Sequence, residues 1–275
     1  MGACPRMHRR ADDGVIDQPP LEIERTYTDM GYVTALILAA GEGKRMRSDR
    51  AKVIHEVNGK AMIEWVYEAT RDAGIEKCVV IVGHKAEQVM ECMGNKVEYV
   101  MQEQRLGTGH AVQQARRYLG GDGSIVVLCG DTPLISAKTI RNAIEYMKDG
   151  NYKAIVLTAD LSDPYGYGRV LRDCKGNFAR IVEHRDASEC ERATREINSG
   201  MYVFSSKELL DALQLLKNDN GQCEYYLTDT LEIILSKGYC VGVYKIEDSD
   251  EVLGINDQLQ LQQASVILKR RGSKF

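Results

Sequence analysis

Three strongly apolar segments constrain the fold of this chain more than any other feature of its sequence. They read VTALIL, CVVIV and SIVVLC and occupy residues 33–38, 78–82 and 124–129. Such nearly continuous apolar runs of strand length are typical of parallel strands that are covered on both faces. Between the first two runs, Met62, Val66, Ala69 and Ala73 recur at helical spacing. The alternation predicts β-α-β units, and hence an α/β, Rossmann-like, mostly parallel sheet flanked by helices.

The rest of the sequence extends this alternation up to Asp160 and then changes it. Beyond Asp160, strand-like segments joined by polar turns come first, and helices return later. The remaining strands are expected at residues 97–101, 153–159, 167–171, 179–184, 197–204 and 241–246, and the helices at 61–73, 86–93, 108–119, 136–148, 207–216, 226–237 and 257–270. Because no linker-like stretch separates the two halves, we expect them to share one sheet.

Composition and charge exclude several functional classes. The 275 residues carry a mildly acidic net charge of −4 with mixed signs, and no basic stripe could neutralise a nucleic-acid backbone. No apolar run approaches the length needed to cross a membrane. The eight cysteines are scattered and no pair has C-x-x-C spacing, which argues against a zinc knuckle or a redox motif. We therefore expect a cytoplasmic protein with reduced cysteines and neither nucleic-acid nor membrane partners.

A glycine-containing loop follows the first apolar strand and reads LAAGEGKRM from Leu38 to Met46. Glycines let backbone N–H groups approach a phosphate closely, and Lys44, Arg45 and Lys52 add positive charge. The loop fits neither the dinucleotide pattern G-x-G-x-x-G nor the P-loop pattern, because Met46 and Arg45 stand at positions that those patterns fix. A tight turn that merely needs glycine is the structural alternative. The glycines together with three cations favour phosphate binding.

A second polar strand end lies at Gly130 and Asp131, directly after the third apolar run. A carboxylate at the carboxyl end of a parallel strand is well placed to bind Mg²⁺, which prefers oxygen ligands and nucleotide phosphates. The structural alternative is an aspartate that opens a turn before Pro133.

The glycine loop and seven later motifs resemble those of the sugar-nucleotidyltransferase family. The pattern L-A-A-G-x-G-x-R-M followed by Lys52 is typical of the family as a whole. The later motifs are similar to the uridylyltransferase domain of the bifunctional N-acetylglucosamine-1-phosphate uridyltransferases. They are LGTGHA at 106–111, GDTPLI at 130–135, GYGR at 166–169, VEHRDA at 182–187, EINSG at 196–200, EYYLTD at 224–229 and GIND at 254–257.

The resemblance covers residues 33 to about 261 and implies a nucleotidyltransferase (GT-A-like) architecture. We accordingly divide the chain into a flexible tail at 1–30, a nucleotidyltransferase domain at 31–261, and the end of the last helix with a short tail at 262–275. The polar tail contains Pro19 and Pro20 and lacks the apolar core of a secretory signal. A start of synthesis at Met30 is a second possibility for this end of the chain.

What the resemblance implies is the reaction of UTP with N-acetylglucosamine 1-phosphate to give UDP-N-acetylglucosamine and pyrophosphate, assisted by Mg²⁺. Arg45 and Lys52 would be catalytic, because they would stabilise charge that develops on the phosphates. Asp131 and Asn256 would hold the metal. The nucleotide would be bound by Leu38, Ala39, Ala40, Gly41, Gly43, Gln102, Gly107, Thr108 and Gly130, and the sugar by Gly168, Glu183, Asn198, Tyr226 and Thr228.

Two alternatives remain open at this level. One is a glucose-1-phosphate uridylyl- or thymidylyltransferase, because the N-acetyl group of the sugar cannot be deduced from composition or spacing. The other is a regulatory protein that binds a nucleotide sugar without turnover. The presence of Arg45, Lys52, Asp131 and Asn256 favours an enzyme.

Some features depart from the family or have simple interpretations. Arg105 stands where the family often has Gln, and Cys129 where it often has Tyr. Glu42 is interpreted as a solvated loop residue, Trp65 as a core residue, and the sequence Lys-Arg-Arg at 269–271 as a solvated helix end. No hexapeptide periodicity is present, so we expect neither the acetyltransferase activity of the bifunctional enzymes nor their β-helix trimer; the oligomeric state is otherwise open.

Overall fold

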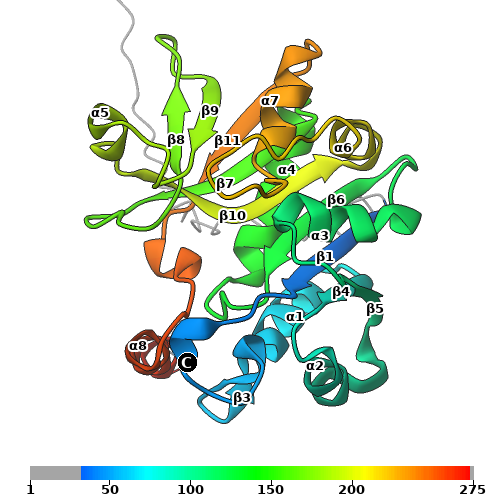
Figure 1. Ribbon diagram of the computed structural model, residues 1–275, viewed down its shortest axis with the longest axis vertical. Helices are drawn as coiled ribbons and strands as arrows, with labels where there is room; N and C mark the ends of the chain where they lie inside the picture. Colours follow the sequence, from blue (N-terminus) through cyan, green and yellow to red (C-terminus); the bar gives the residue numbers. More distant parts are fainter. Residues whose placement is uncertain (1–31, 273–275) are drawn as a thin grey trace, which may run out of the picture.

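The computed structural model describes residues 32–272 of the chain, and nine strands of this part form one sheet (Figure 1). The expected tail at 1–30, the candidate start at Met30 and the last three residues lie outside the described residues. The strands of the sheet are β1 (Val33–Ala39), β4 (Lys77–Val82), β5 (Glu98–Met101), β6 (Ser124–Cys129), β7 (Ala154–Asp160), β8 (Arg169–Arg172), β9 (Phe178–Val182), β10 (Glu196–Ser205) and β11 (Val241–Lys245).

The central part of the sheet has the strand order β11-β7-β10-β6-β1-β4-β5. Strand β1 pairs in parallel with β4 and β6, β4 pairs in parallel with β5, and β11 pairs in parallel with β7. Strand β10 is the exception, because it is antiparallel to both β6 and β7, between which it lies. Strands β8 and β9 form an antiparallel hairpin that branches from β10. The predicted mostly parallel sheet shared by both halves of the chain is confirmed.

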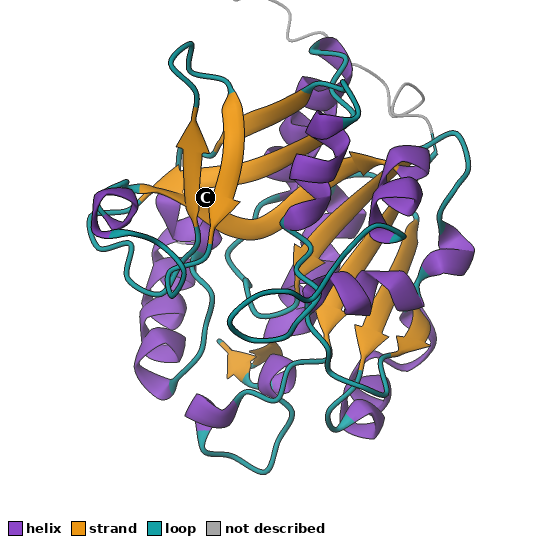
Figure 2. Ribbon diagram, turned by 45° about the horizontal axis from the view of Figure 1, so that its top comes forward, coloured by secondary structure: helices purple, strands orange, loops and turns teal. Residues whose placement is uncertain are grey.

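Helices cover both faces of this sheet, as the apolar strand runs predict (Figure 2). On β1, Ala35 and Ile37 belong to one core cluster, whereas Leu36 between them belongs to the cluster on the opposite face. The helices are α1 (Met62–Asp72), α2 (Ala86–Met93), α3 (Thr108–Gln114), α4 (Ala137–Asp149), α5 (Glu189–Arg192), α6 (Ser206–Leu213), α7 (Asp229–Ser236) and α8 (Gln258–Gly272). The first cluster includes side chains of α1, α2 and α4, and the second includes side chains of α3, α6 and α7.

Two helices are at least four residues shorter than the sequence pattern predicts. The expected helix at 108–119 ends at Gln114, and a 3-10 turn at Arg116–Tyr118 completes the segment with i→i+3 hydrogen bonds. The expected helix at 226–237 begins only at Asp229, and the residues before it form turns with i→i+3 hydrogen bonds, from the Asp229 N–H to the Tyr226 carbonyl and from the Thr230 N–H to the Leu227 carbonyl.

The final helix, α8, packs against a small hairpin formed by β2 (Glu56–Val57) and β3 (Lys60–Ala61). It extends across the predicted boundary at 261. Its end is not merely solvated, because Arg271 donates hydrogen bonds to the Leu134 carbonyl at 2.6 Å and to Asp248 at 2.7 Å. Of the helices within 32–272, none combines the length and the apolarity that crossing a membrane requires.

Candidate active site

A cavity of about 620 Å³ opens at the carboxyl ends of β1 and β6. Ligands of open α/β sheets bind at this edge, because loops diverge there from adjacent strands. Most of the residues predicted to bind nucleotide or metal, or to act in catalysis, line it: Leu38, Ala39, Ala40, Gly41, Gly43, Arg45, Lys52, Gln102, Gly107, Thr108, Asp131 and Asn256. We call this cavity the cationic pocket, because its lining also includes Lys44 and Arg105.

Two glycines bring the walls of the cationic pocket together. Gly43 has a φ of +65°, and a Cβ on it would lie 2.6 Å from the Cβ of Lys52. Gly130 is not itself in the lining, but its N–H donates to the Leu38 carbonyl at 2.9 Å and a Cβ there would lie 3.0 Å from that oxygen. The glycine loop thus packs directly on Lys52, and the ends of β1 and β6 are held side by side.

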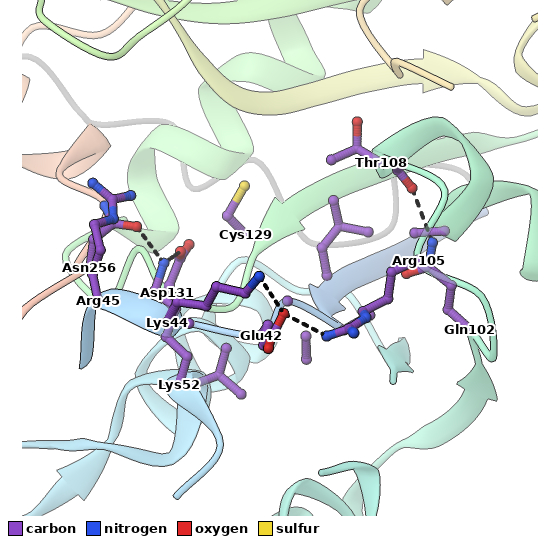
Figure 3. A pocket seen from close by; sticks show the side chains of 18 of the residues that line it. Glu42, Lys44, Arg45, Lys52, Gln102, Arg105, Thr108, Cys129, Asp131 and Asn256 are labelled. Atoms are coloured by element: carbon purple, nitrogen blue, oxygen red, sulfur yellow. Dashed lines mark hydrogen bonds and ion pairs between the residues drawn. The ribbon is translucent and has the colours of Figure 1, made fainter. Parts of the chain in front are cut away.

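The floor of the cationic pocket joins three side chains from distant parts of the chain. The Lys52 ammonium forms an ion pair with the Asp131 carboxylate and donates a hydrogen bond to Asn256 Oδ1 at 2.7 Å (Figure 3). The Lys52 side chain is only 11% exposed. Contacts with backbone carbonyls hold the two acceptor residues in place, because the Ile255 N–H donates to the Asp131 carbonyl at 2.9 Å and Asn256 Nδ2 donates to the Gly254 carbonyl at 2.9 Å.

The same geometry suits a hard cation. Asp131 and Asn256 direct two oxygens at one position, which the Lys52 ammonium fills in this structure, and oxygens are the ligands that Mg²⁺ prefers. Within residues 32–272 there is no group of three or more His, Cys, Asp or Glu side chains that could hold a metal. A metal here would therefore need further oxygens, such as those of a nucleotide's phosphates.

A second set of charges lies at the rim of the cationic pocket and corrects the interpretation of Glu42. Its carboxylate is not simply solvated, because one oxygen lies 3.0 Å from Arg105 Nη1 and 3.4 Å from Lys44 Nζ (Figure 3). Arg45 also lines the pocket and, unlike these residues, has no ion-pair partner among residues 32–272. Its guanidinium is thus available to an anion.

One wall of the pocket carries a buried amide. Gln102 is 4% exposed, and its Nε2 donates to the Gly107 carbonyl at 3.0 Å. This bond fixes the orientation of the amide, because a carbonyl can only accept. No residue in the described part of the chain donates to Gln102 Oε1. The carbonyl oxygen of Gln102 is therefore available to accept a hydrogen bond from a ligand.

A second cavity, of about 530 Å³, has the opposite charge. It is lined by the carboxylates of Glu183, Asp186, Asp219 and Asp229 and by a single cation, Lys217. We call it the acidic pocket. Burial raises the pKa of Glu183, and the negative charges of Asp186, Asp229 and Glu224 raise it further. Burial also raises the pKa of Asp229.

The residues predicted to bind sugar gather in and beside the acidic pocket. Glu183, Tyr226 and Thr228 line it. Gly168 and Asn198 are not in its lining but lie next to Glu183, because a Cβ on Gly168 would be 3.4 Å from Glu183 Oε1 and the Asn198 N–H donates to the Gly168 carbonyl at 2.9 Å. The Asn198 side chain is hydrogen-bonded to the Tyr202 hydroxyl at 2.8 Å.

Two loops connect the pockets through backbone hydrogen bonds. The Tyr225 N–H donates to the Leu106 carbonyl at 2.7 Å, and the Gly109 N–H donates to the Tyr225 carbonyl at 2.8 Å. Thr108 Oγ1 accepts from the Leu227 N–H at 3.1 Å. Gly107 must lack a side chain, because a Cβ would lie 2.5 Å from the Tyr225 carbonyl oxygen. The loop beside the cationic pocket and the loop that leads into the acidic pocket therefore form one unit.

Sequence reasoning assigned no role to several lining residues. Asp186 and Glu224 lie inside the quoted motifs VEHRDA and EYYLTD, so the motifs carried a signal for them. The pairing of Glu42 with Arg105 joins two loops that the motifs place at the same site, and their opposite charges were the available signal. Lys217 and Asp219 lie in a segment without any motif, and no sequence signal distinguishes them.

The sequence matches the family model of the MobA-like NTP transferase domain over residues 35–230. It is 54% identical over 243 residues to the bifunctional protein GlmU of Acetivibrio thermocellus, which covers 88% of this chain and 53% of that protein. It is 48% identical over 238 residues to GlmU of a Geobacillus species, which covers 86% of this chain and 52% of that protein. The chain thus spans about half the length of the curated relatives that it matches.

Comparison with solved structures confirms the predicted nucleotidyltransferase architecture. A crystal structure assigned as a glucose-1-phosphate thymidylyltransferase from Bacillus anthracis superposes with a TM-score of 0.69. The match covers 86% of this chain and 94% of that one, at 20% identity. At this level of identity, the likeness bears on the fold alone.

Proposed function

Because the chain belongs to the MobA-like NTP transferase domain family, we propose that it transfers a uridylyl group from UTP to N-acetylglucosamine 1-phosphate and releases pyrophosphate. The observation that carries this proposal is the convergence of Lys52, Asp131 and Asn256 at the floor of a pocket lined by cations and glycines. The motifs that resemble uridylyltransferase domains support the choice of nucleotide and sugar, and the similarity to GlmU proteins over 86–88% of the chain agrees with that resemblance.

The cationic pocket receives the nucleotide in this proposal. The backbone at 38–41 and Gly43 lie along the phosphates, and Gln102 Oε1 accepts a hydrogen bond from the uracil ring N–H. Thr108 and Gly107 complete the wall next to the base. The Lys52 ammonium and the Arg45 guanidinium balance the negative charge of the triphosphate.

The acidic pocket receives the sugar ring. Carboxylates repel phosphate but accept hydrogen bonds from hydroxyl groups, so Glu183 favours the neutral ring over its phosphate. Tyr226 and Thr228 offer further hydroxyl groups beside it. The sugar phosphate consequently points away from the carboxylates and toward the cations. This opposition of charge orients the second substrate.

In the proposed reaction, an oxygen of the sugar phosphate attacks the α-phosphorus of UTP. A new P–O bond forms there, the bond from the α-phosphorus to the bridging oxygen breaks, and its electron pair leaves on pyrophosphate. No protein nucleophile is needed, because the sugar phosphate is already anionic. The task of the protein is to hold two polyanions in line and to stabilise charge on the leaving group, which Arg45 and Lys52 perform.

Asp131 and Asn256 would hold Mg²⁺ together with nucleotide phosphates. When bound, the ion would polarise the phosphates and neutralise part of their charge. Lys52 would then leave the two oxygens and turn toward the phosphates.

A crossed substrate panel tests this function. UTP, dTTP and CTP are each combined with glucose, N-acetylglucosamine and N-acetylgalactosamine 1-phosphates in the presence of Mg²⁺, and pyrophosphate release and the nucleotide-sugar product are measured. We expect the highest kcat/KM for UTP with N-acetylglucosamine 1-phosphate. A preference for glucose 1-phosphate with UTP or dTTP would replace this assignment. Binding of nucleotide sugar without pyrophosphate release would instead indicate a regulatory protein.

A further inference from the structure

We propose that Arg105 is an additional triphosphate-binding residue, which exchanges its ion pair with Glu42 for the phosphates of the incoming nucleotide. This inference rests on the proposed function, because it needs a nucleoside triphosphate in the cationic pocket. It adds a residue that the family motifs do not provide, since Arg105 stands where Gln is frequent in the family that the sequence resembles.

The position of Arg105 spans the two rims of the cationic pocket. Arg105 belongs to the loop between β5 and α3, on the side of Gln102, whereas Glu42 belongs to the glycine loop after β1. The Arg105 guanidinium nevertheless reaches the Glu42 carboxylate, with 3.0 Å between Nη1 and Oε2 (Figure 3). Both side chains line the cavity. The Arg105 guanidinium therefore lies beside the glycine loop, which we expect to contact the phosphates, and faces the space for the ligand.

Hydrogen bonds of the two residues that follow Arg105 hold its backbone in place. The next residue, Leu106, accepts a backbone hydrogen bond from Tyr225 at 2.7 Å. Gly107 accepts one from the buried Gln102 side chain at 3.0 Å. A change of partner by Arg105 therefore requires rotation of its own side chain and no movement of the loop.

The present partner of Arg105 is easily replaced. The Arg105 and Glu42 side chains are 47% and 37% exposed, and an ion pair at such exposure contributes little because water and salt screen it. Glu42 also shares the same oxygen with Lys44 at 3.4 Å. A triphosphate carries several negative charges, and a guanidinium binds phosphate oxygens through two parallel hydrogen bonds. Phosphate consequently competes well against a single shared carboxylate oxygen.

Two substitutions with opposite expected effects test the exchange. The dissociation constant of Mg·UTP is measured by titration calorimetry without sugar phosphate, so that no turnover occurs. Arg105→Gln should weaken UTP binding about ten-fold, which corresponds to about 1.4 kcal/mol. Glu42→Gln should strengthen it, because the two cations are then released to the phosphates. Arg105→Lys should give an intermediate affinity, because it keeps the charge but loses the two-pronged contact.

UMP and a matched arginine serve as controls. UMP has the same base and ribose as UTP but lacks the outer phosphates, so Arg105→Gln should leave its affinity unchanged. Arg116→Gln removes one exposed arginine charge outside the cationic pocket and should not alter UTP binding. Melting temperatures of all variants verify that they are folded.

Three results would overturn the proposal: an unchanged UTP affinity in Arg105→Gln, an equal loss for UMP and UTP, or weaker UTP binding in Glu42→Gln. Failure of the proposed function has a different signature. If the wild type prefers another nucleoside triphosphate, the uridylyl assignment is wrong, and the same comparison is made with that nucleotide and its monophosphate. If the wild type binds no nucleoside triphosphate, both proposals are wrong.

Discussion

The cationic pocket and the acidic pocket are similar in size but opposite in charge. The first, of about 620 Å³, is lined by four cations and three carboxylates, whereas the second, of about 530 Å³, is lined by four carboxylates and one lysine. The cations of the first are Lys44, Arg45, Lys52 and Arg105, and its carboxylates are Glu42, Asp131 and Glu224. They also differ in how their charged groups are held. Lys52 is tightly paired at the floor of the first pocket, whereas the half-buried Glu183 of the second lies among like charges that raise its pKa.

In the function proposed above, this difference would let one domain sort two substrates that both carry phosphate. A polyanion is attracted to the cationic pocket and repelled from the acidic one, while a sugar ring finds hydrogen-bond acceptors in the acidic pocket. The mildly acidic net charge of the protein is compatible with this proposal, because the local charge of a cavity matters more than the net charge. The predictions below test whether the cationic pocket binds the nucleotide and the acidic pocket the sugar ring, in order of decreasing effect.

The largest effect is expected from Lys52→Met, which removes the cation at the floor of the cationic pocket. We expect kcat for pyrophosphate release to fall by about 10²–10³-fold, the loss typical for one donor that stabilises developing charge. Binding of Mn²⁺ without nucleotide should become tighter, since Asp131 and Asn256 lose their present partner. Electron paramagnetic resonance measures that binding. Lys44→Met, at a side chain that is 79% exposed, should lower kcat less. An equal loss in both variants would contradict a special role for Lys52.

Gly107→Ala should break the connection between the two pockets. The new methyl group would lie 2.5 Å from the Tyr225 carbonyl oxygen, at a residue with a φ of +104°. The strain and the clash should lower the free energy of unfolding by roughly 1–3 kcal/mol. The KM values of both substrates should rise together, because both loops shift. Gly121→Ala is the control, since a Cβ there meets nothing within 4 Å. A rise in only one KM would show that the pockets are independent.

Glu183→Gln should affect the sugar side alone. A hydrogen bond to a carboxylate is stronger than one to a neutral amide, so the KM for the sugar phosphate should rise about ten-fold while the KM for UTP stays unchanged. Asp219→Asn removes the same charge from an exposed part of the lining and should have a smaller effect. Steady-state kinetics with each substrate varied in turn gives both constants. A rise in the KM for UTP would contradict the assignment of the sugar ring, and not the nucleotide, to the acidic pocket.

The smallest effect concerns the stability cost of the acidic pocket. Because the pKa of Glu183 in the folded protein is raised above its ordinary 4.5, the folded state holds the proton more tightly than the unfolded chain does. Ionisation of Glu183 therefore lowers the free energy of unfolding. The full loss is present at pH values above the raised pKa, and it is absent at pH values below the ordinary pKa. Glu183→Gln should raise the melting temperature at pH 8 and leave it unchanged at pH 3.5. Calorimetry at the two pH values measures both, and a destabilised variant at pH 8 would refute this view.

The sheet could be predicted well because its signal is local. The segments at 33–38, 78–82 and 124–129 are apolar at consecutive positions. Such runs are typical of central strands whose two faces are both buried, as they are here. The start of α4 also has a local signal, because serine is a typical helix cap and the Ser136 Oγ accepts from the Thr139 N–H at 3.1 Å. The end of α3 at Gln114 was not predictable, because the apolar spacing continues through a segment that tightens into a 3-10 turn.

The site could be predicted only as a set of loops. The motifs identified the strand ends that hold functional residues. The pairing of Glu42 with Arg105 could not be predicted, because it depends on the distance between two loops on opposite rims of the cavity. The charge of the acidic pocket was also hidden, since Asp186, Asp219 and Asp229 come from separate segments. Their proximity follows from tertiary packing and leaves no periodic trace in the sequence.

The sequence by itself determined the alternation of strands and helices, the two-sided burial of the central strands and the places of the glycine loop and Asp131. All of these depend on neighbours within a few residues or on repeating polarity. Only the tertiary structure decided that β10 lies antiparallel between β6 and β7, and that Lys52 meets Asp131 and Asn256. Those contacts join residues up to 204 positions apart, and they form because the core of the whole domain brings distant loops to one edge of the sheet.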